Sequence, residues 1–226
     1  MPHLSPELIT YLEQFVQADR ILRLKEVLDK RTNYISVVTD QVVDPHNISA
    51  ICRSAECFGV QNIHLIESNF PFRGARRIQR GSLNWVNVHR YDGENKTQDC
   101  IQTLKAKGYK IVAVSIHAAS KSIADLNFDQ PIALVMGQEQ NGVSKEIMDA
   151  ADECVIIPMQ GFTESLNVSV ACSIALYDLR KRLEESGIKW ELSDEDRNEL
   201  YQQWLFDSIK RPELIIEHYN KTIANK

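Results

Sequence analysis

The sequence predicts an α/β protein with a mostly parallel sheet and helices on both of its faces. Two observations lead to this fold class. Short apolar runs alternate with amphipathic helical patterns between about residues 34 and 185. In addition, the runs Ile111–Ile116 and Ile132–Met136 are almost continuously apolar, which is typical of parallel strands that are buried on both faces.

The expected elements follow one another regularly along the chain. Strands are expected at residues 34–39, 62–66, 85–89, 111–116, 132–136 and 154–157. Helices are expected at residues 7–30, 47–58, 96–107, 144–151 and 166–185. Asn47 can cap the second of these helices. Pro158 stops the last strand because proline has no amide for the sheet ladder, and either Ser165 or Asn167 can cap the last helix.

We expect three parts along the chain. Residues 1–30 form an N-terminal helical extension, residues 31–186 form the α/β domain, and residues 187–226 form a C-terminal helical extension. The last part has a different character, because a polar helix starts near Ser193 and another is expected over Pro212–Tyr219.

Composition limits the class of protein. The 226 residues carry a net charge of −5 and 43% hydrophobic residues, as ordinary globular proteins do. No apolar stretch is long enough to cross a membrane, and the N-terminus lacks a signal-peptide layout. The histidines show no metal-ligand spacing and the cysteines no paired motif, so we expect no metal and a cytoplasmic protein with reduced, buried thiols. The cysteines are Cys52, Cys57, Cys100, Cys154 and Cys172.

Two basic clusters contrast with the acidic net charge. They are Arg73, Arg76, Arg77 and Arg80, and Arg20, Arg23, Lys25, Lys30 and Arg31. The net charge argues against a general nucleic-acid-binding surface, and such runs are commonly solvated faces. Both clusters nevertheless remain candidates for phosphate contacts.

Three polar segments near strand ends hold the candidates for chemistry. The segment Asn47–Arg53 opens a helix with an amide and ends in an arginine. The segment Gly137–Ser144 has two glycines around Glu139, which let the backbone approach a ligand closely. The segment Pro158–Ala171 leads into a helix start that suits polar ligands. Each segment can also be an ordinary connection to a capped helix. The chain has neither the lysine of a phosphate loop nor a GxGxxG pattern.

Together, these segments resemble the motifs of the SpoU/TrmH family of RNA ribose 2′-O-methyltransferases, within the SPOUT class of knotted, S-adenosylmethionine-dependent enzymes. The resemblance lies in Asn47–Val60, Gly137–Gly142 and Ile157–Ala171, which occur in the family's order. It implies a C-terminal deep trefoil knot, whereas composition and periodicity alone favour an unknotted chain.

The resemblance also implies roles for single residues. Arg53 is the expected central catalytic residue, and because a guanidinium stays protonated we expect it to hold a phosphate and orient the 2′-hydroxyl rather than to act as a base. Glu139 should fix its own loop and orient Arg53. The other catalytic candidates are Asn47, Ser165 and Asn167. The residues expected to bind S-adenosylmethionine are Val114, Gly137, Ile157, Met159 and Leu166.

The flanking helices resemble those of the branch that methylates a guanosine in the tRNA D-loop, so tRNA is the expected partner. One alternative is the same chemistry on ribosomal RNA or on the tRNA wobble nucleotide. However, the short segment before the first strand leaves no room for the RNA-binding domain of many ribosomal enzymes. A second alternative, a non-catalytic RNA-binding module, predicts the loss of Arg53 or Asn167, and both are present. The resemblance further implies a homodimer through the helix after Asn167, although its apolar residues fit an intrachain core equally well.

Overall fold

The computed structural model describes residues 4–68, 82–116 and 120–224. The chain forms two compact units. The larger unit spans residues 32–190 and contains the sheet. The smaller unit combines the residues up to Arg31 with those from Glu191 onward. The two terminal helical segments therefore belong to one unit.

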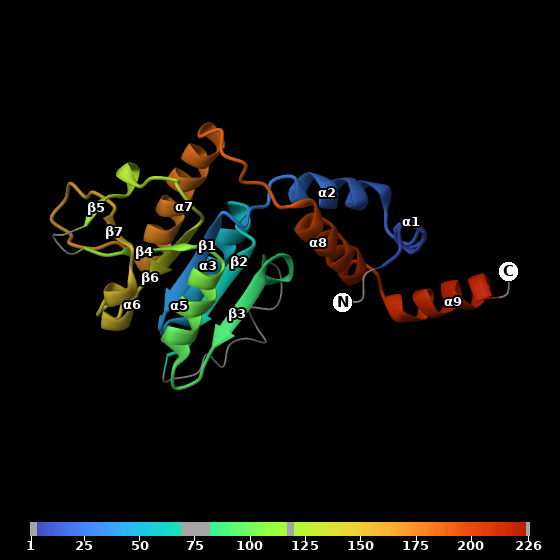
Figure 1. Ribbon diagram of the computed structural model, residues 1–226, viewed down its shortest axis with the longest axis horizontal. Coiled ribbons are helices and arrows are strands. Elements are labelled where there is room, and N and C mark those ends of the chain that lie inside the picture. The colour runs from blue at the N-terminus through green and yellow to red at the C-terminus, as the bar shows by residue number, and fades with distance from the viewer. Residues whose placement is uncertain (1–3, 69–81, 117–119, 225–226) are drawn as a thin grey trace. The chain divides into compact units, whose positions relative to one another are not determined.

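The larger unit is built on a parallel sheet, in which the described residues form seven strands (Figure 1). The strand order is β3-β2-β1-β6-β4-β7-β5, and each neighbouring pair is parallel. The strands are β1 Ile35–Asp40, β2 Asn62–Ile66, β3 Asn87–Tyr91, β4 Lys110–Val114, β5 Lys121–Ser122, β6 Ile132–Met136 and β7 Glu153–Ile156. The predicted α/β class with a mostly parallel sheet is confirmed.

The strands β1 and β6 lie in the middle of the sheet, where helices on both faces bury them. Every residue of these two strands is buried. Thr39 of β1 lies beside Met136 of β6, and Met136 lies in turn beside Val114 of β4. The carboxyl ends of these strands therefore meet at one edge, which is where ligands usually bind in an open α/β sheet.

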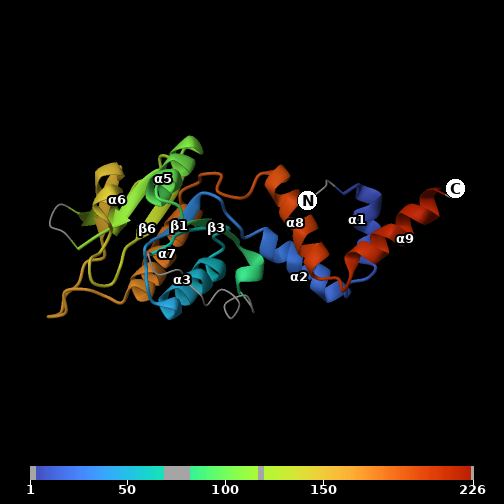
Figure 2. The same ribbon diagram turned by 90° about the horizontal axis from the view of Figure 1, so that it is seen from below.

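Helices cover both faces of the sheet, as Figure 2 shows. They are α3 Pro45–Cys57, α5 Lys96–Ala106, α6 Lys145–Ala150 and α7 Val168–Glu185. The helices α3 and α7 share one hydrophobic core with the sheet, and α5 and α6 share another. Because successive side chains of a strand point to opposite faces, Val37 belongs to the first core and Val38 to the second.

The smaller unit is helical, and here one sequence prediction is wrong. Instead of a single helix over residues 7–30, the chain forms two helices separated by a turn. The helices of this unit are α1 Pro6–Glu13, α2 Ala18–Leu28, α8 Asp194–Asp207 and α9 Pro212–Ala224. The apolar spacing continues across the turn, so periodicity does not detect the break. The break lets Leu12 pack with Leu205 and Ile209 of the C-terminal segment.

Burial in the smaller unit also removes one basic residue from the RNA candidates. Arg31 is 1% exposed, and its guanidinium carbon lies 5.2 Å from the ring centre of Trp204. A buried arginine stacked on tryptophan stabilises the packing of the unit. It does not contact a phosphate backbone.

The structure identifies the N-cap residues of α3 and α7. Asp44 caps α3, because its Oδ1 accepts a hydrogen bond from the His46 amide at 2.9 Å. The predicted cap, Asn47, instead lies inside the helix, and its side chain is available for other contacts. For α7, Asn167 is the cap rather than Ser165, and its Oδ1 accepts from the Ser169 amide at 2.9 Å.

The remaining differences concern short elements and one thiol. The sequence prediction omits β5, and the strand expected from Trp85 begins at Asn87, after a 3-10 turn over Ser82–Trp85. The cysteines are free, but Cys57 is exposed, so the expectation of buried thiols is wrong there. None of the described helices combines the length and the apolar composition that a membrane crossing requires. The trefoil knot stays a prediction.

Candidate active site

A cavity of about 360 Å³ lies at the carboxyl ends of β4, β6 and β7. All five residues predicted to bind S-adenosylmethionine line it, namely Val114, Gly137, Ile157, Met159 and Leu166. The start of α7 closes one side through Val168 and Ala171. The walls are mostly apolar side chains and backbone, as in most small-molecule sites.

Gly137 is required by the shape of the cavity wall. A Cβ atom at this position would lie 2.2 Å from the Gly142 carbonyl carbon and 2.2 Å from the Val143 nitrogen. The loop folds back this closely because Gln138 and Gly142 exchange backbone hydrogen bonds of 2.8 and 2.9 Å. Gly142 has a φ of 66°, which a glycine adopts without strain. The two glycines therefore allow a tight loop directly at the end of β6.

Asp40 anchors the far end of this loop, and sequence reasoning missed it. It ends β1, is 1% exposed, and accepts a hydrogen bond from the Ser144 amide at 2.6 Å. Burial raises the pKa of its carboxyl. The available signal was an acidic residue at the end of an otherwise apolar strand. Because Ser144 caps α6, Asp40 fixes the point where the loop enters that helix.

A chain of side-chain hydrogen bonds joins the three polar segments. The Asn47 amide nitrogen donates to Oε1 of Glu139 in a short hydrogen bond. The Asn167 amide nitrogen donates to Oδ1 of Asn47 at 3.1 Å. Asn47 is 9% exposed, and its side chain is available for both bonds because Asp44 caps α3. Three of the five predicted catalytic residues are therefore in direct contact, although the sequence separates them by up to 120 positions.

The other two predicted catalytic residues, Arg53 and Ser165, are not part of this hydrogen-bond chain. Arg53 is exposed on α3, and within the described parts of the chain it forms no ion pair with Glu139. No ion pair therefore supports the expectation that Glu139 orients Arg53, and Glu139 accepts a hydrogen bond from Asn47 instead. Ser165 lines the cavity and is exposed. Ser54, which follows Arg53 in α3, shares a 2.7 Å hydrogen bond with Ser173 of α7.

The predicted RNA contacts lie in two places. Arg20 and Arg23 are exposed on α2 of the smaller unit, where Arg23 forms an ion pair of 3.2 Å with Glu26. The other cluster, Arg73, Arg76, Arg77 and Arg80, lies outside the described residues. Over the ranges that the structure covers, no group of three or more His, Cys, Asp or Glu side chains is arranged to hold a metal ion.

Comparison with known proteins decides the family. The profile of the SpoU rRNA methylase family matches residues 34–177, which include all three polar segments. The chain belongs to this family. A relative in Borreliella burgdorferi, named tRNA (guanosine(18)-2′-O)-methyltransferase, is 33% identical over 92% of this chain and 94% of its own length. The predicted family is therefore confirmed.

Two solved structures of RNA-modifying enzymes have a similar fold. A tRNA modifying enzyme of A. aeolicus, TrmH/SpoU, superposes with a TM-score of 0.73 at 33% identity, covering 88% of this chain and 99% of that one. An rRNA methyltransferase of Sinorhizobium meliloti with bound AdoMet has a TM-score of 0.59 at 30% identity, covering 71% of this chain and 60% of that one. The similarity to the first structure extends beyond the sheet domain into the terminal helices.

Proposed function

We propose that this protein transfers a methyl group from S-adenosylmethionine to the ribose 2′-hydroxyl of a guanosine in the tRNA D-loop. The observation that carries the proposal is the Glu139–Asn47–Asn167 hydrogen-bond chain, which brings the three polar segments together beside the cavity. The relatives that span most of this chain are named for guanosine 18 of tRNA, which supports the choice of substrate.

The cavity fits S-adenosylmethionine. Its volume, about 360 Å³, lies in the range of small-molecule sites. Val114, Ile157 and Leu166 offer apolar surface for an adenine ring, and Gly137 leaves backbone rather than side chain at the wall. When bound there, S-adenosylmethionine supplies an electrophilic methyl group. The solved relative from Sinorhizobium meliloti holds this cofactor, which supports the assignment.

Arg53 is the residue that we assign to the RNA side of the reaction. Its guanidinium stays protonated, so it donates hydrogen bonds and does not remove a proton. It is exposed on α3, six positions after Asn47, and can grip a phosphate with two parallel hydrogen bonds. In that position it orients the neighbouring ribose and stabilises negative charge that develops on the 2′-oxygen.

The amide and carboxylate groups hold the site in shape. Asn167 bonds Asn47 and also caps α7, so it ties the loop after β7 to α3. Asn47 bonds Glu139 and so ties α3 to the loop after β6. Ser165, on the cavity wall, offers a hydroxyl to the ribose or to the cofactor. These contacts preorganise the loops between which the two substrates meet.

RNA binding and assembly complete the proposal. Arg20 and Arg23, with the cluster from Arg73 to Arg80, would contact phosphates and so set register rather than sequence. The helix α7 exposes Val170, Ile174 and Tyr177 at helical spacing, with exposed fractions of 46%, 40% and 61%. We propose that this apolar face joins two copies of the chain in a homodimer. A tRNA-modifying enzyme of this kind would act in the cytoplasm.

The test is transfer of tritium from labelled S-adenosylmethionine to unmodified tRNA transcripts, followed by nuclease mapping of the labelled nucleotide. Label at the D-loop guanosine with wild type, and its loss with Arg53→Ala, would support the proposal. Lys107→Ala is the matched control, because Lys107 is an exposed cation at the end of α5, on the opposite face of the sheet. Label in ribosomal RNA or the anticodon loop would overturn the substrate assignment.

A further inference from the structure

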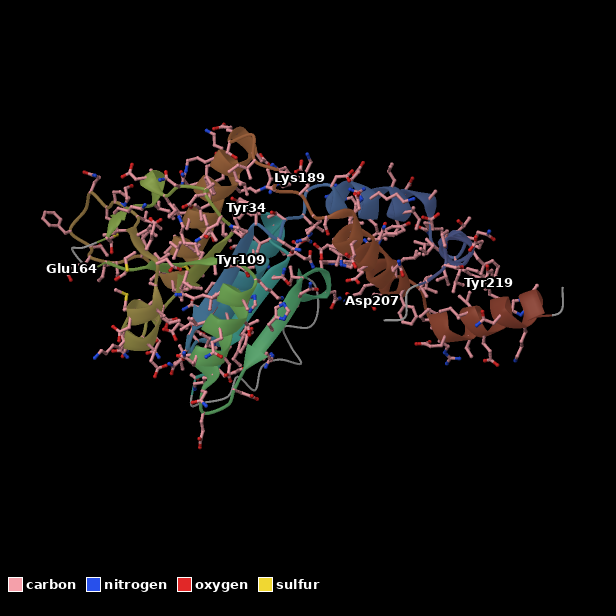
Figure 3. All side chains as sticks on the ribbon, in the orientation of Figure 1. Tyr34, Tyr109, Glu164, Lys189, Asp207 and Tyr219 are labelled. Atoms are coloured by element: carbon pink, nitrogen blue, oxygen red, sulfur yellow. The ribbon has the colours of Figure 1, made fainter. Side chains whose placement is uncertain are left out.

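The described lining of the cavity is acidic. Its described lining residues include two acidic side chains, Glu139 and Glu164, and no lysine, arginine or histidine. They come from separate segments, Glu139 from the loop after β6 and Glu164 from the loop between β7 and α7. Figure 3 shows Glu164 on that second loop, near the edge of the sheet formed by β5 and β7.

Neither charge is compensated by a cation in the described parts of the chain. Glu139 accepts a hydrogen bond from the Asn47 amide, which is neutral and leaves the carboxylate charge in place. Glu164 takes part in none of the ion pairs found among the described residues. The amino terminus of α7 carries partial positive charge, but Asn167 already caps its first amides. The lining therefore carries a net negative charge.

We propose that Glu164, together with Glu139, makes the cavity discriminate by charge between the methyl donor and the spent cofactor. The inference rests on the proposed function. S-adenosylmethionine has a cationic sulfonium, a cationic ammonium and one carboxylate, whereas S-adenosylhomocysteine has a neutral thioether in place of the sulfonium. On transfer, the C–S bond breaks and leaves its electron pair on sulfur, the O–C bond forms, and the ribose hydroxyl proton passes to water. The ligand loses one positive charge, and with it the attraction between the acidic lining and the sulfonium.

This charge selection would serve turnover. The two ligands have nearly the same shape, so apolar walls such as Val114 and Ile157 bind them about equally. Both ligands also carry the same ammonium and carboxylate, so the additional attraction of a negatively charged lining to the sulfonium is what separates them. Glu164 is the informative residue to change, because it lies on the cavity wall but outside the hydrogen-bond chain of Asn47, Glu139 and Asn167.

The experiment is isothermal titration of the full-length protein with S-adenosylmethionine and with S-adenosylhomocysteine, without RNA. Glu164→Gln keeps the size of the side chain and removes its charge. Because Glu164 is exposed, we expect the Kd for S-adenosylmethionine to rise about threefold. This is a change that the interaction energy of one pair of unit charges in water can produce. The Kd for S-adenosylhomocysteine should change less than about twofold. Glu185→Gln, at the other end of α7, controls for general surface charge and should leave both constants unchanged.

Salt provides a second readout. The preference of wild type for S-adenosylmethionine over S-adenosylhomocysteine should decrease as the salt concentration rises from about 0.1 M to about 1 M, because the Debye screening length falls from about 10 Å to about 3 Å. Equal changes of both Kd values in Glu164→Gln, or no change in either, would overturn the charge-selection proposal while leaving the proposed function intact. Wild type that binds neither ligand would overturn the proposed function itself, and this inference with it.

Discussion

Replacing Asn47 by aspartate should weaken the site at the point where its three segments meet. The change keeps the shape of the side chain and its ability to accept from Asn167, but it turns the donor facing Glu139 into a second anionic acceptor. The lost hydrogen bond to a charged acceptor costs about 1–2 kcal/mol. Two carboxylates about 4 Å apart repel by about 1 kcal/mol in water. We therefore expect the free energy of unfolding to fall by about 2–3 kcal/mol.

Urea unfolding of wild type, Asn47→Asp and Asn47→Ala would measure this loss. The alanine variant loses the bonds without adding charge, so it should lose less, about 1–2 kcal/mol. The aspartate variant should also recover stability as the pH falls. Repulsion raises the pKa of the carboxyl pair in the folded state, so the cost is complete above that pKa and disappears as the pH drops through it.

A double variant makes the test specific. Asn47→Asp combined with Glu139→Gln reverses donor and acceptor, so the glutamine amide can donate to the new carboxylate. It should recover most of the lost stability. Asn47→Asp protein as stable as wild type, or a double variant that recovers no stability, would contradict the role given to the Asn47–Glu139 hydrogen bond.

Three further predictions follow from single residues. Gly137→Ala should raise the Kd for S-adenosylmethionine more than tenfold in titration, because the added Cβ would lie 2.2 Å from backbone of Gly142 and Val143; unchanged affinity would contradict the tight loop. Burial lowers the pKa of His64 to about 3; neutral His64 therefore stabilises the fold above its unfolded pKa. Between about pH 7.5 and pH 5, the free energy of unfolding of wild type should therefore fall by about 2 kcal/mol more than that of His64→Gln. The same pH dependence in urea unfolding of both proteins would argue against this. Arg53→Lys should lower kcat for tRNA well over tenfold and leave the Kd for S-adenosylmethionine unchanged, because lysine cannot form the paired hydrogen bonds to a phosphate. A kcat equal to that of wild type would contradict the phosphate contact assigned to Arg53.

The sequence predicts the central strands well for a physical reason. A strand buried on both faces must be apolar throughout, and Ile132–Met136 shows this without ambiguity. The two-residue strand Lys121–Ser122 is too short to carry any periodicity. Periodicity predicts one N-terminal helix because the apolar spacing persists through the turn after Glu13. Turn position depends on what each helix packs against, and local sequence does not contain that information.

The site was predictable as a set of residues but not as a set of contacts. The motifs identify Asn47, Glu139 and Asn167, and the structure brings them together. Which of them bonds to which depends on strand order and on the cap of α3, where Asp44 rather than Asn47 satisfies the helix amides. The sequence does not reveal the role of Asp40, because that role depends on the end of β1 lying beside the start of α6.

The most direct test of the proposed activity uses a tRNA transcript with 2′-deoxyguanosine at position 18, the position named for the relatives. Tritium transfer from S-adenosylmethionine should fall to background with this RNA, whereas the transcript with an ordinary guanosine should be labelled. Both transcripts should bind the protein with similar affinity. Undiminished transfer to the deoxy transcript would mean that the 2′-hydroxyl of that guanosine is not the acceptor.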